Sequence, residues 1–143
     1  MNLAYQRQPF NRADRQRITL SQLNEILLNP NHTLFLLYSG EKICGTVLLS
    51  QSEISLFAIH PAFQGHGYGQ QLLVAAEEEA FKAYDSVLLK VIPLFQEKLI
   101  TYYESLGYCS QDEREALSKG KLDRIQECYH DEVYALILRK NRP

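Results

Sequence analysis

Three glycines alternate with other residues in the run Gln64-Gly65-His66-Gly67-Tyr68-Gly69. The run follows a strand-like segment over residues 53–60 and precedes a segment of helical periodicity that starts at residue 68. Glycines at such a junction permit positive φ and let a ligand approach the backbone closely. The N–H groups of the helix start then point outward at the positive end of the helix dipole, where anions bind. This pattern predicts a loop that holds phosphate, and a diphosphate fits it best.

Three common explanations of a glycine-rich helix start fit this run poorly. A P-loop needs Lys-Ser or Lys-Thr after its glycines, and this sequence has neither there. The dinucleotide fingerprint needs a third glycine where Gln70 stands, and it begins directly after the strand, whereas residues 61–64 intervene here. A ligand-free, flexible helix start is the plainest alternative, but three glycines at that position cost stability.

The remaining periodicity predicts a mixed α/β fold. Strands are expected at Leu3 and Tyr5 and over 33–38, 42–50, 53–60, 86–92 and 133–139, and helices over 19–28, 68–83 and 94–106. Thr19 and Gln22 have the spacing of a capping box, and Leu20, Leu23 and Leu27 form the expected apolar stripe of that first helix. In the helix over 68–83, Glu77 lies off the apolar stripe and is expected on the exposed face, whereas the stripe consists of apolar or small residues at helical spacing: Gly69, Leu72, Leu73, Ala76, Ala80 and Ala83.

The order of these elements predicts the sheet. Short turns join the strands over 33–60, so they form an antiparallel meander. A helix separates the strands over 53–60 and 86–92, which indicates a right-handed β-α-β crossover between parallel strands. The strand over 86–92 has little alternation, as expected if both its faces are covered. Residues 110–131 are polar and are expected to be irregular, with a short helix near 113–118.

Size and composition narrow the class of protein. A chain of 143 residues that is 45% hydrophobic suits one domain over residues 1–143. The net charge of −2 favours neither disorder nor a nucleic-acid-binding surface. The longest apolar run, residues 34–38, is too short to cross a membrane, and the N-terminus lacks a secretory signal pattern. Three cysteines without a CxxC pair predict no metal site and reduced thiols in a cytoplasmic protein.

A second motif, Tyr102-Tyr-Glu-Ser-Leu-Gly-Tyr108, lies downstream of the glycine loop. Gln64, Gly67 and Gly69 fill the pattern Gln/Arg-x-x-Gly-x-Gly/Ala. With these two motifs in this order, the chain resembles the GNAT superfamily of acetyl-CoA-dependent N-acetyltransferases over about residues 32–108. The segment over 56–61 is similar to the family's fourth strand and the turn after it. The resemblance implies the GNAT fold: antiparallel N-terminal strands, a central crossover with splayed parallel strands, and a C-terminal helix and strand.

The resemblance also implies a binding site for coenzyme A. The pyrophosphate would contact the loop residues Gln64, Gly65, His66, Gly67, Tyr68, Gly69 and Gln70. The pantetheine arm would pair with the backbone of Phe57, Ala58 and Ile59, and an N–H group near Ile59 would polarise the thioester carbonyl. Gln96 stands where many members have a pantetheine-binding asparagine, and it offers the same amide one methylene further out.

Two side chains are implied to carry the chemistry. Tyr103 matches the tyrosine that protonates the departing coenzyme A sulfur, and a phenol with a reference pKa of about 10 holds its proton at neutral pH. The alternative for Tyr103 is a packing role beside Tyr102, which lies in the apolar stripe of its helix, whereas Tyr103 lies towards the edge of that stripe. Glu53 begins its strand at a spacing similar to the base of the histone-acetylating members. The alternative for Glu53 is an exposed strand-end carboxylate, with a water chain as the base.

The implied activity is transfer of an acetyl group from acetyl-CoA to a primary amine in a ternary complex. The acceptor is a small molecule or a peptide or protein amine that the sequence does not identify. No metal, nucleic acid or membrane is expected to take part, and the protein is expected to be a monomer or a homodimer. One alternative is a GNAT-like domain that binds acyl-CoA as a sensor without transferring it. A second is a nucleotide-binding α/β domain that takes ATP or NAD.

Overall fold

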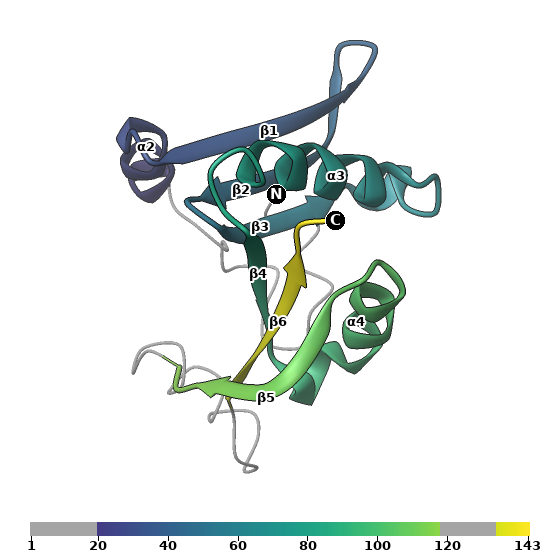
Figure 1. Cartoon of the computed structure of the whole chain (residues 1–143). Coiled ribbons are helices and arrows are strands. Elements are labelled where there is room, and N and C mark those ends of the chain that lie inside the picture. The colour runs from purple at the N-terminus through teal and green to yellow at the C-terminus, as the bar shows by residue number, and fades with distance from the viewer. Residues whose placement is uncertain (1–19, 118–133) are drawn as a thin grey trace. The chain divides into compact units, whose positions relative to one another are not determined.

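A computed structural model describes residues 20–117 and 134–143 of the chain. In these residues the backbone forms six strands, three α-helices and one short 3-10 helix, which confirms the mixed α/β class (Figure 1). The chain divides into two compact units: the first runs to Val87 and includes Arg142–Pro143, and the second is Leu88–Asn141. The strand expected at Leu3 and Tyr5 and the capping residue Thr19 lie outside the described residues.

The first unit is built on the antiparallel meander that the sequence predicts. Strands β1 (His32–Ser39), β2 (Lys42–Ser50) and β3 (Glu53–Ile59) pair in that order. The turn between β1 and β2 contains Gly40 at φ +63°, a conformation that glycine adopts without strain. Because β2 lies between the other two strands, residues 44–49 are all buried and form the centre of the core.

Helix α3 (Tyr68–Ala80) packs on β1, β2 and β3 (Figure 1). The predicted apolar stripe is buried at Leu72, Leu73, Ala76 and Ala80. Two details of the prediction are wrong. Glu77, expected on the exposed face, is only 5% exposed, and the helix ends at Ala80 rather than at residue 83, because its last turn tightens into i→i+3 hydrogen bonds.

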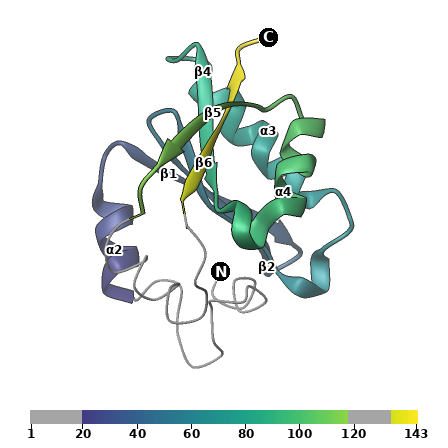
Figure 2. The ribbon, with the colours of Figure 1, turned by 90° about the horizontal axis from the view of Figure 1, so that it is seen from below.

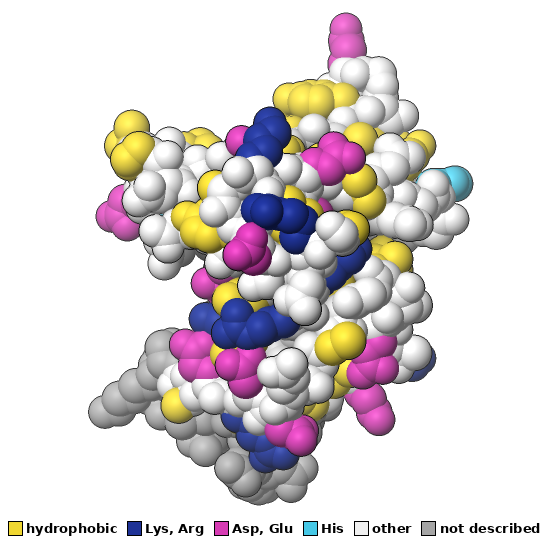
Figure 3. Space-filling model, viewed as in Figure 1, with side chains coloured by type: hydrophobic (Ala, Val, Ile, Leu, Met, Phe, Trp, Pro, Cys, Tyr) yellow, Lys and Arg dark blue, Asp and Glu magenta, His cyan; other side chains and the backbone are white. Residues whose placement is uncertain are grey.

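Helix α2 (Leu20–Leu28) contacts β1, where the Nδ1 atom of His32 lies 3.0 Å from the carbonyl oxygen of Ile26. The helix is confirmed, but its predicted apolar stripe is wrong at two positions. Leu20 and Leu27 are 74% and 52% exposed, because the helix turns its Leu23 and Ile26 side inward. Figure 3 shows the resulting apolar side chains at the surface over α2.

The second unit holds most of β4 (Ser86–Val91) together with α4 (Pro93–Ser105), β5 (Cys109–Glu115) and β6 (Ala135–Asn141). Its strand order is β4-β6-β5, and α4 lies beside β6 (Figure 2). Strand β4 alternates more than the sequence predicts. Leu89 and Val91 are buried, whereas Lys90 is exposed and its Nζ lies 2.6 Å from a carboxylate oxygen of Glu115.

Strand β5 corrects the prediction of irregular structure with a short helix near residues 113–118. Its backbone pairs antiparallel with β6, from Cys109 opposite Arg139 to Glu115 opposite Ala135. Side chains support this pairing, since Arg139 Nε donates a hydrogen bond of 2.6 Å to Glu113. All seven side chains of β5 are polar or cysteine, and the partner strand lies far along the chain. A local pattern therefore could not reveal β5.

The crossover prediction is confirmed only in chain order, because α3 stands between β3 and β4. The parallel direction of those two strands and the single-domain organisation stay predictions, since both concern the relation between the units. Among the described residues, no helix is long and apolar enough to span a membrane.

Candidate active site

The glycine loop leaves β3 through a short, well-braced turn. Residues Pro61–Phe63 form the 3-10 helix η1, and the ring of His60 caps it by accepting a hydrogen bond of 3.1 Å from the Ala62 N–H group. Gln64 then donates from its side-chain amide to the carbonyl oxygen of Ile59, at 3.0 Å. The loop is therefore tied back to the end of β3 on both sides of η1.

Two glycines of the loop adopt backbone conformations that other residues avoid. Gly65 has φ +84° and Gly67 has φ +79°. An added Cβ at either position would meet none of the described atoms within 4 Å. Glycine is thus required there by the backbone angles and not by crowding within the free protein.

Gly67 is also the N-cap of α3. An N-cap residue normally satisfies the first helical N–H groups with a side-chain oxygen, which glycine lacks. The N–H groups at Tyr68, Gly69 and Gln70 therefore stand at the positive end of the helix dipole without a cap from Gly67. Such a helix start accepts the oxygens of a phosphate.

Aromatic rings surround this loop. His60 and Phe63 meet edge to face with ring centroids 5.8 Å apart, and Phe63 lies 6.4 Å from the ring of Tyr68. Tyr68 in turn lies 5.7 Å from the ring of His66. These contacts connect the turn before the glycines to the first turn of α3, so they stabilise the loop conformation.

Strand β3 contains a bulge that the sequence did not indicate. Its register against β2 shifts between Thr46 and Leu48, so that Leu56 and Phe57 together stand opposite Val47. Leu56 has φ +46°, in the left-handed region that leucine rarely adopts. A bulge bends its strand and changes where the following backbone groups point. The affected residues 57–59 are those expected to bind the pantetheine arm.

Gly45 of β2 brings three elements close together. A Cβ at this position would lie 2.5 Å from Ile59 Cδ1 and 2.9 Å from Leu72 Cδ1. Only a glycine leaves room for the end of β3 and the start of α3 to pack on the same point of β2. This requirement follows from tertiary packing, and no local motif around Gly45 indicated it.

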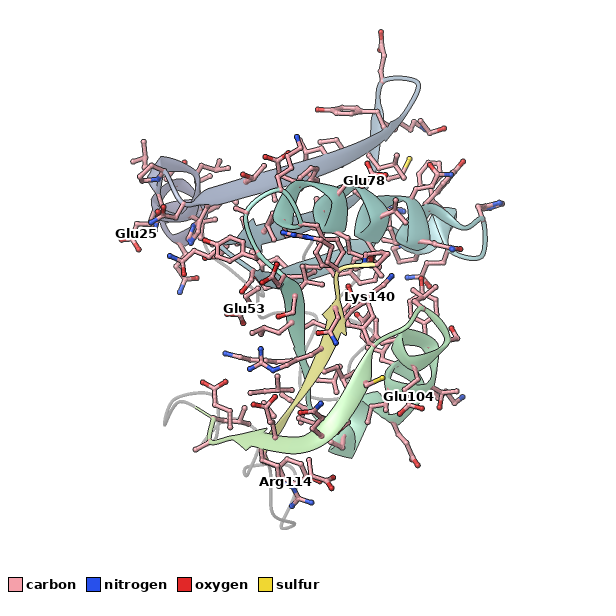
Figure 4. The ribbon with its side chains drawn as sticks, viewed as in Figure 1. Glu25, Glu53, Glu78, Glu104, Arg114 and Lys140 are labelled. Atoms are coloured by element: carbon pink, nitrogen blue, oxygen red, sulfur yellow. The ribbon has the colours of Figure 1, made fainter. Side chains whose placement is uncertain are left out.

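Glu53 is the first residue of β3 and pairs with Ser50 in the register of the meander (Figure 4). Its side chain is half-buried, so its carboxylate is neither a core group nor a freely solvated one. This position is compatible with proton transfer to or from a group at the surface of the first unit. The role of Glu53 as the base stays a prediction.

Tyr103 lies in α4 and is only 5% exposed. Its ring lies 5.5 Å from that of Tyr102 and meets Tyr108 edge to face at 5.8 Å. The expectation that Tyr102 forms the apolar stripe and Tyr103 its edge is wrong in degree, because Tyr102 is the more exposed of the two. Partial burial nevertheless raises the pKa of Tyr102. Gln96 also lies in α4, and its side chain is outside the described part of the chain.

The downstream motif owes its Leu-Gly-Tyr ending to the way α4 stops. Gly107 has φ +96°, and its N–H donates a hydrogen bond of 3.0 Å to the carbonyl oxygen of Glu104. The N–H of Tyr108 donates a hydrogen bond of 3.1 Å to the carbonyl oxygen of Tyr103. This pair of hydrogen bonds is the Schellman motif, and the ring contact between Tyr103 and Tyr108 is its usual hydrophobic partner. Glycine here therefore fixes the last turn that carries Tyr103.

The predicted site residues fall into both units. Glu53, the segment over 57–59 and the glycine loop belong to the first unit, whereas Gln96 and Tyr103 belong to the second. Their meeting in one active site stays a prediction. Within the described residues, no group of three or more histidine, cysteine and carboxylate side chains is arranged to hold a metal ion.

Comparison with known proteins supports the same assignment. The model of the acetyltransferase (GNAT) family matches residues 2–108, which is well over half of the chain. The chain belongs to this family. It is accordingly an acyltransferase, with the mixed α/β fold of the GNAT proteins. No curated protein sequence matches the chain.

Many solved structures share this GNAT fold. An acetyltransferase of Bacillus subtilis in complex with CoA is 18% identical, with TM-score 0.64, covering 87% of this chain and 85% of its own. A GNAT acetyltransferase of Elizabethkingia anophelis with acetyl-CoA bound is 16% identical, with TM-score 0.67 and coverages of 87% and 84%. The ribosomal-protein-S18-alanine N-acetyltransferase of Escherichia coli is 16% identical, with TM-score 0.66 and coverages of 90% and 79%. These likenesses concern the fold.

Proposed function

We propose that this GNAT protein transfers an acetyl group from acetyl-CoA to a primary amine of a small molecule, peptide or protein, by direct attack in a ternary complex. The observation that carries the proposal is the start of α3. Gly67 is a left-handed N-cap there, so helical N–H groups without a side-chain cap from Gly67 follow a loop that is hydrogen-bonded to the end of β3. This arrangement suits the pyrophosphate of coenzyme A.

In the proposed complex the cosubstrate extends from the glycine loop along β3. The phosphate oxygens accept hydrogen bonds from N–H groups of the loop and of the first turn of α3. The amide and carbonyl groups of the pantetheine arm pair with backbone groups of Phe57–Ile59. An N–H group near Ile59 then donates to the thioester carbonyl oxygen and stabilises the negative charge that develops on it.

Transfer then needs two proton movements. The amine nitrogen attacks the carbonyl carbon, a C–N bond forms, and the C–S bond breaks with its electron pair leaving on sulfur. Tyr103 donates its phenolic proton to that sulfur, and Glu53 accepts the proton that the amine loses, directly or through water. The products are the acetylated amine and free coenzyme A.

The structural neighbours support the choice of substrates. Two were crystallised with CoA or acetyl-CoA, and the name of a third places its acceptor at an alanine of a ribosomal protein. Their identities to this chain are below 20%, so they support an amine acceptor as a class and name none for this protein. Cys44 and Cys109 are free thiols, which supports the proposed cytoplasmic location.

Calorimetry followed by a thiol-release assay tests the proposal. We expect the protein to bind coenzyme A and acetyl-CoA, and to release thiol from acetyl-CoA when at least one member of a panel of amines and N-terminal peptides is added. Binding of ATP or NAD without binding of coenzyme A would instead identify a nucleotide-binding domain.

A second function is favoured by one outcome of the same experiment. Binding of coenzyme A without turnover of any of the amines would weaken the enzyme proposal and favour a domain that binds acyl-CoA as a sensor. The presence of both Glu53 and Tyr103 favours the enzyme, because a sensor needs neither a base nor an acid at those positions.

A further inference from the structure

Thr46 is one of two buried polar or charged side chains among the described residues, the other being Glu77. It lies on β2 opposite Ala58 and is 6% exposed. Its hydroxyl group donates a hydrogen bond of 3.2 Å to the carbonyl oxygen of Leu56. A buried hydroxyl needs such a partner, and a partly buried carbonyl is stabilised by a donor. The pair therefore satisfies two groups at once.

The position of this hydrogen bond is significant because Leu56 is the bulged residue of β3. At φ +46° its peptide is turned away from the direction that a regular strand would give it. A leucine has no intrinsic preference for that conformation, so contacts around it must hold it there. The Thr46 hydroxyl provides one such contact from the neighbouring strand.

The bulge also sets the phase of the backbone that follows it. In a strand, the N–H and C=O groups of successive residues point to alternate edges of the strand. Compared with the same sequence in a regular strand, the extra residue of the bulge therefore reverses the edge that the backbone groups of residues 57–59 face. We propose that Thr46 is a positioning residue, whose hydroxyl holds Leu56 in the bulge and so aims the backbone of Phe57–Ile59 at the pantetheine arm. This inference rests on the proposed function, because it assumes that coenzyme A binds along β3.

A merely structural threonine would behave differently. Its loss would destabilise the protein and lower the affinity for every ligand of the first unit to the same extent. A positioning role concerns only ligands that reach past the glycine loop onto β3. Coenzyme A does so, whereas 3′-phospho-ADP, which is its nucleotide half without pantetheine, contacts only the loop and the start of α3.

The test compares the Kd values of coenzyme A and 3′-phospho-ADP by calorimetry in the full chain. Thr46→Val keeps the shape of the side chain and removes the hydroxyl group. We expect it to raise the Kd of coenzyme A about tenfold, the order expected for loss of one buried hydrogen bond, and to leave the Kd of 3′-phospho-ADP within about twofold of wild type. Thr46→Ser keeps the hydroxyl and should restore the affinity for coenzyme A.

Leu49→Ala is the matched control, since Leu49 is buried in the same strand but pairs regularly with Ile54, outside the bulge. We expect this variant to lower Tm without changing the ratio of the two Kd values. Equal weakening of both ligands in Thr46→Val, or wild-type affinity for both, would overturn the positioning role. Failure of wild-type protein to bind coenzyme A would overturn the proposed function and this inference with it.

Discussion

Two glycines of the first unit have similar backbones and different expected roles. Gly40 lies in the hairpin turn at φ +63°, and Gly67 begins α3 at φ +79°. A Cβ on either would meet none of the described atoms within 4 Å. The free protein therefore requires both glycines for the same reason, and only a bound phosphate would distinguish them.

Replacing each glycine by alanine should separate these roles. Gly40→Ala and Gly67→Ala should each cost about 1–2 kcal/mol of unfolding free energy, because alanine is strained at these angles. Only Gly67→Ala should also weaken the binding of coenzyme A, at least tenfold beyond the loss caused by Gly40→Ala, because its methyl group would crowd the phosphate oxygens that are proposed to bind at this helix start. Urea denaturation and calorimetry measure the two effects. Equal affinities in the two variants would contradict a phosphate site at Gly67.

The two adjacent tyrosines of α4 permit a similar comparison. Tyr103→Phe should lower turnover by about 10²-fold or more, the usual contribution of a general acid, while the Kd of coenzyme A stays within about twofold. Tyr102→Phe is the control and should retain most of the activity. The rates are measured by thiol release with an amine that wild-type protein acetylates. Unchanged turnover in Tyr103→Phe would remove Tyr103 from the mechanism.

At the scale of elements, the pairing of β5 with β6 is supported by a charged hydrogen bond. The hydrogen bond from Arg139 holds the pKa of Glu113 below its ordinary value of 4.5. The unfolded chain, with the higher pKa, takes up this proton first as pH falls. The stabilisation is therefore present above about pH 4.5 and is lost as pH falls through the lower folded pKa. Both side chains are more than one-third exposed, so the effect is small.

Glu113→Gln should therefore be less stable than wild-type protein at pH 7 and should approach it in stability as pH falls below about 4.5. Tm measured across this range gives the comparison. In Arg139→Gln the partner is already lost, so adding Glu113→Gln should have little further effect at pH 7. Additive losses in the double variant would show that the two side chains are not coupled.

The junction of β2, β3 and α3 depends on the small size of Gly45. Gly45→Ala places a methyl group 2.5 Å from Ile59 Cδ1 and 3.1 Å from the Ala58 carbonyl oxygen, so these groups must move. We expect a loss of about 1–3 kcal/mol in unfolding free energy, as for other overpacked cores. We also expect weaker binding of coenzyme A, because the displaced residues are those proposed to contact the pantetheine arm. Unchanged affinity for coenzyme A would show that the junction tolerates the shift.

The sequence predicted the elements whose signals are local. Gly40 marks a hairpin turn, and the leucines and alanines of α3 repeat at helical spacing, so both could be read directly. Strand β5 could not, since its polar residues become a strand only through pairing with β6. The buried Glu77 was missed for a related reason, because a carboxylate ordinarily indicates an exposed face.

The candidate site shows the same division. The glycine loop could be predicted because positive φ restricts the residue type to glycine at Gly65 and Gly67. The bulge at Leu56 had no such signal, as leucine is untypical of the left-handed region. Thr46 and Gly45 act across strands, so their importance depends on a register that the sequence does not reveal.

At the scale of the whole molecule, the last described residues return to the first unit. The backbone N–H of Arg142 donates a hydrogen bond of 2.7 Å to the carbonyl oxygen of Asp85. The guanidinium of Arg142 donates a hydrogen bond of 2.8 Å to the carbonyl oxygen of Tyr84. The guanidinium also lies 3.2 Å from the carboxylate of Asp85. These contacts anchor the segment after β6 to the segment before β4.

Shortening the chain tests this anchor. Arg142→Ala should cost less than about 1 kcal/mol of unfolding free energy, because the ion pair is exposed and the backbone hydrogen bond remains. Deletion of residues 142–143 removes that bond as well and should cost about 1 kcal/mol more than Arg142→Ala, the net contribution of one hydrogen bond, because Asp85 is exposed and water can replace the lost donor. Urea denaturation distinguishes the two. Equal stability of the deletion variant and wild-type protein would show that the anchor contributes little.

The bulge in β3 also affects how relatives of this chain should be aligned. Loss of one residue at Leu56 or Phe57 would leave a single residue opposite Val47 and restore a regular ladder. Such a deletion would keep Ala58 opposite Thr46, so the backbone groups from there to the end of the strand would keep their facing, but the strained residue and the bend of the bulge would be lost. A one-residue gap at this point of an alignment would therefore indicate a relative without the bulge, whose strand would bind a ligand in a different geometry.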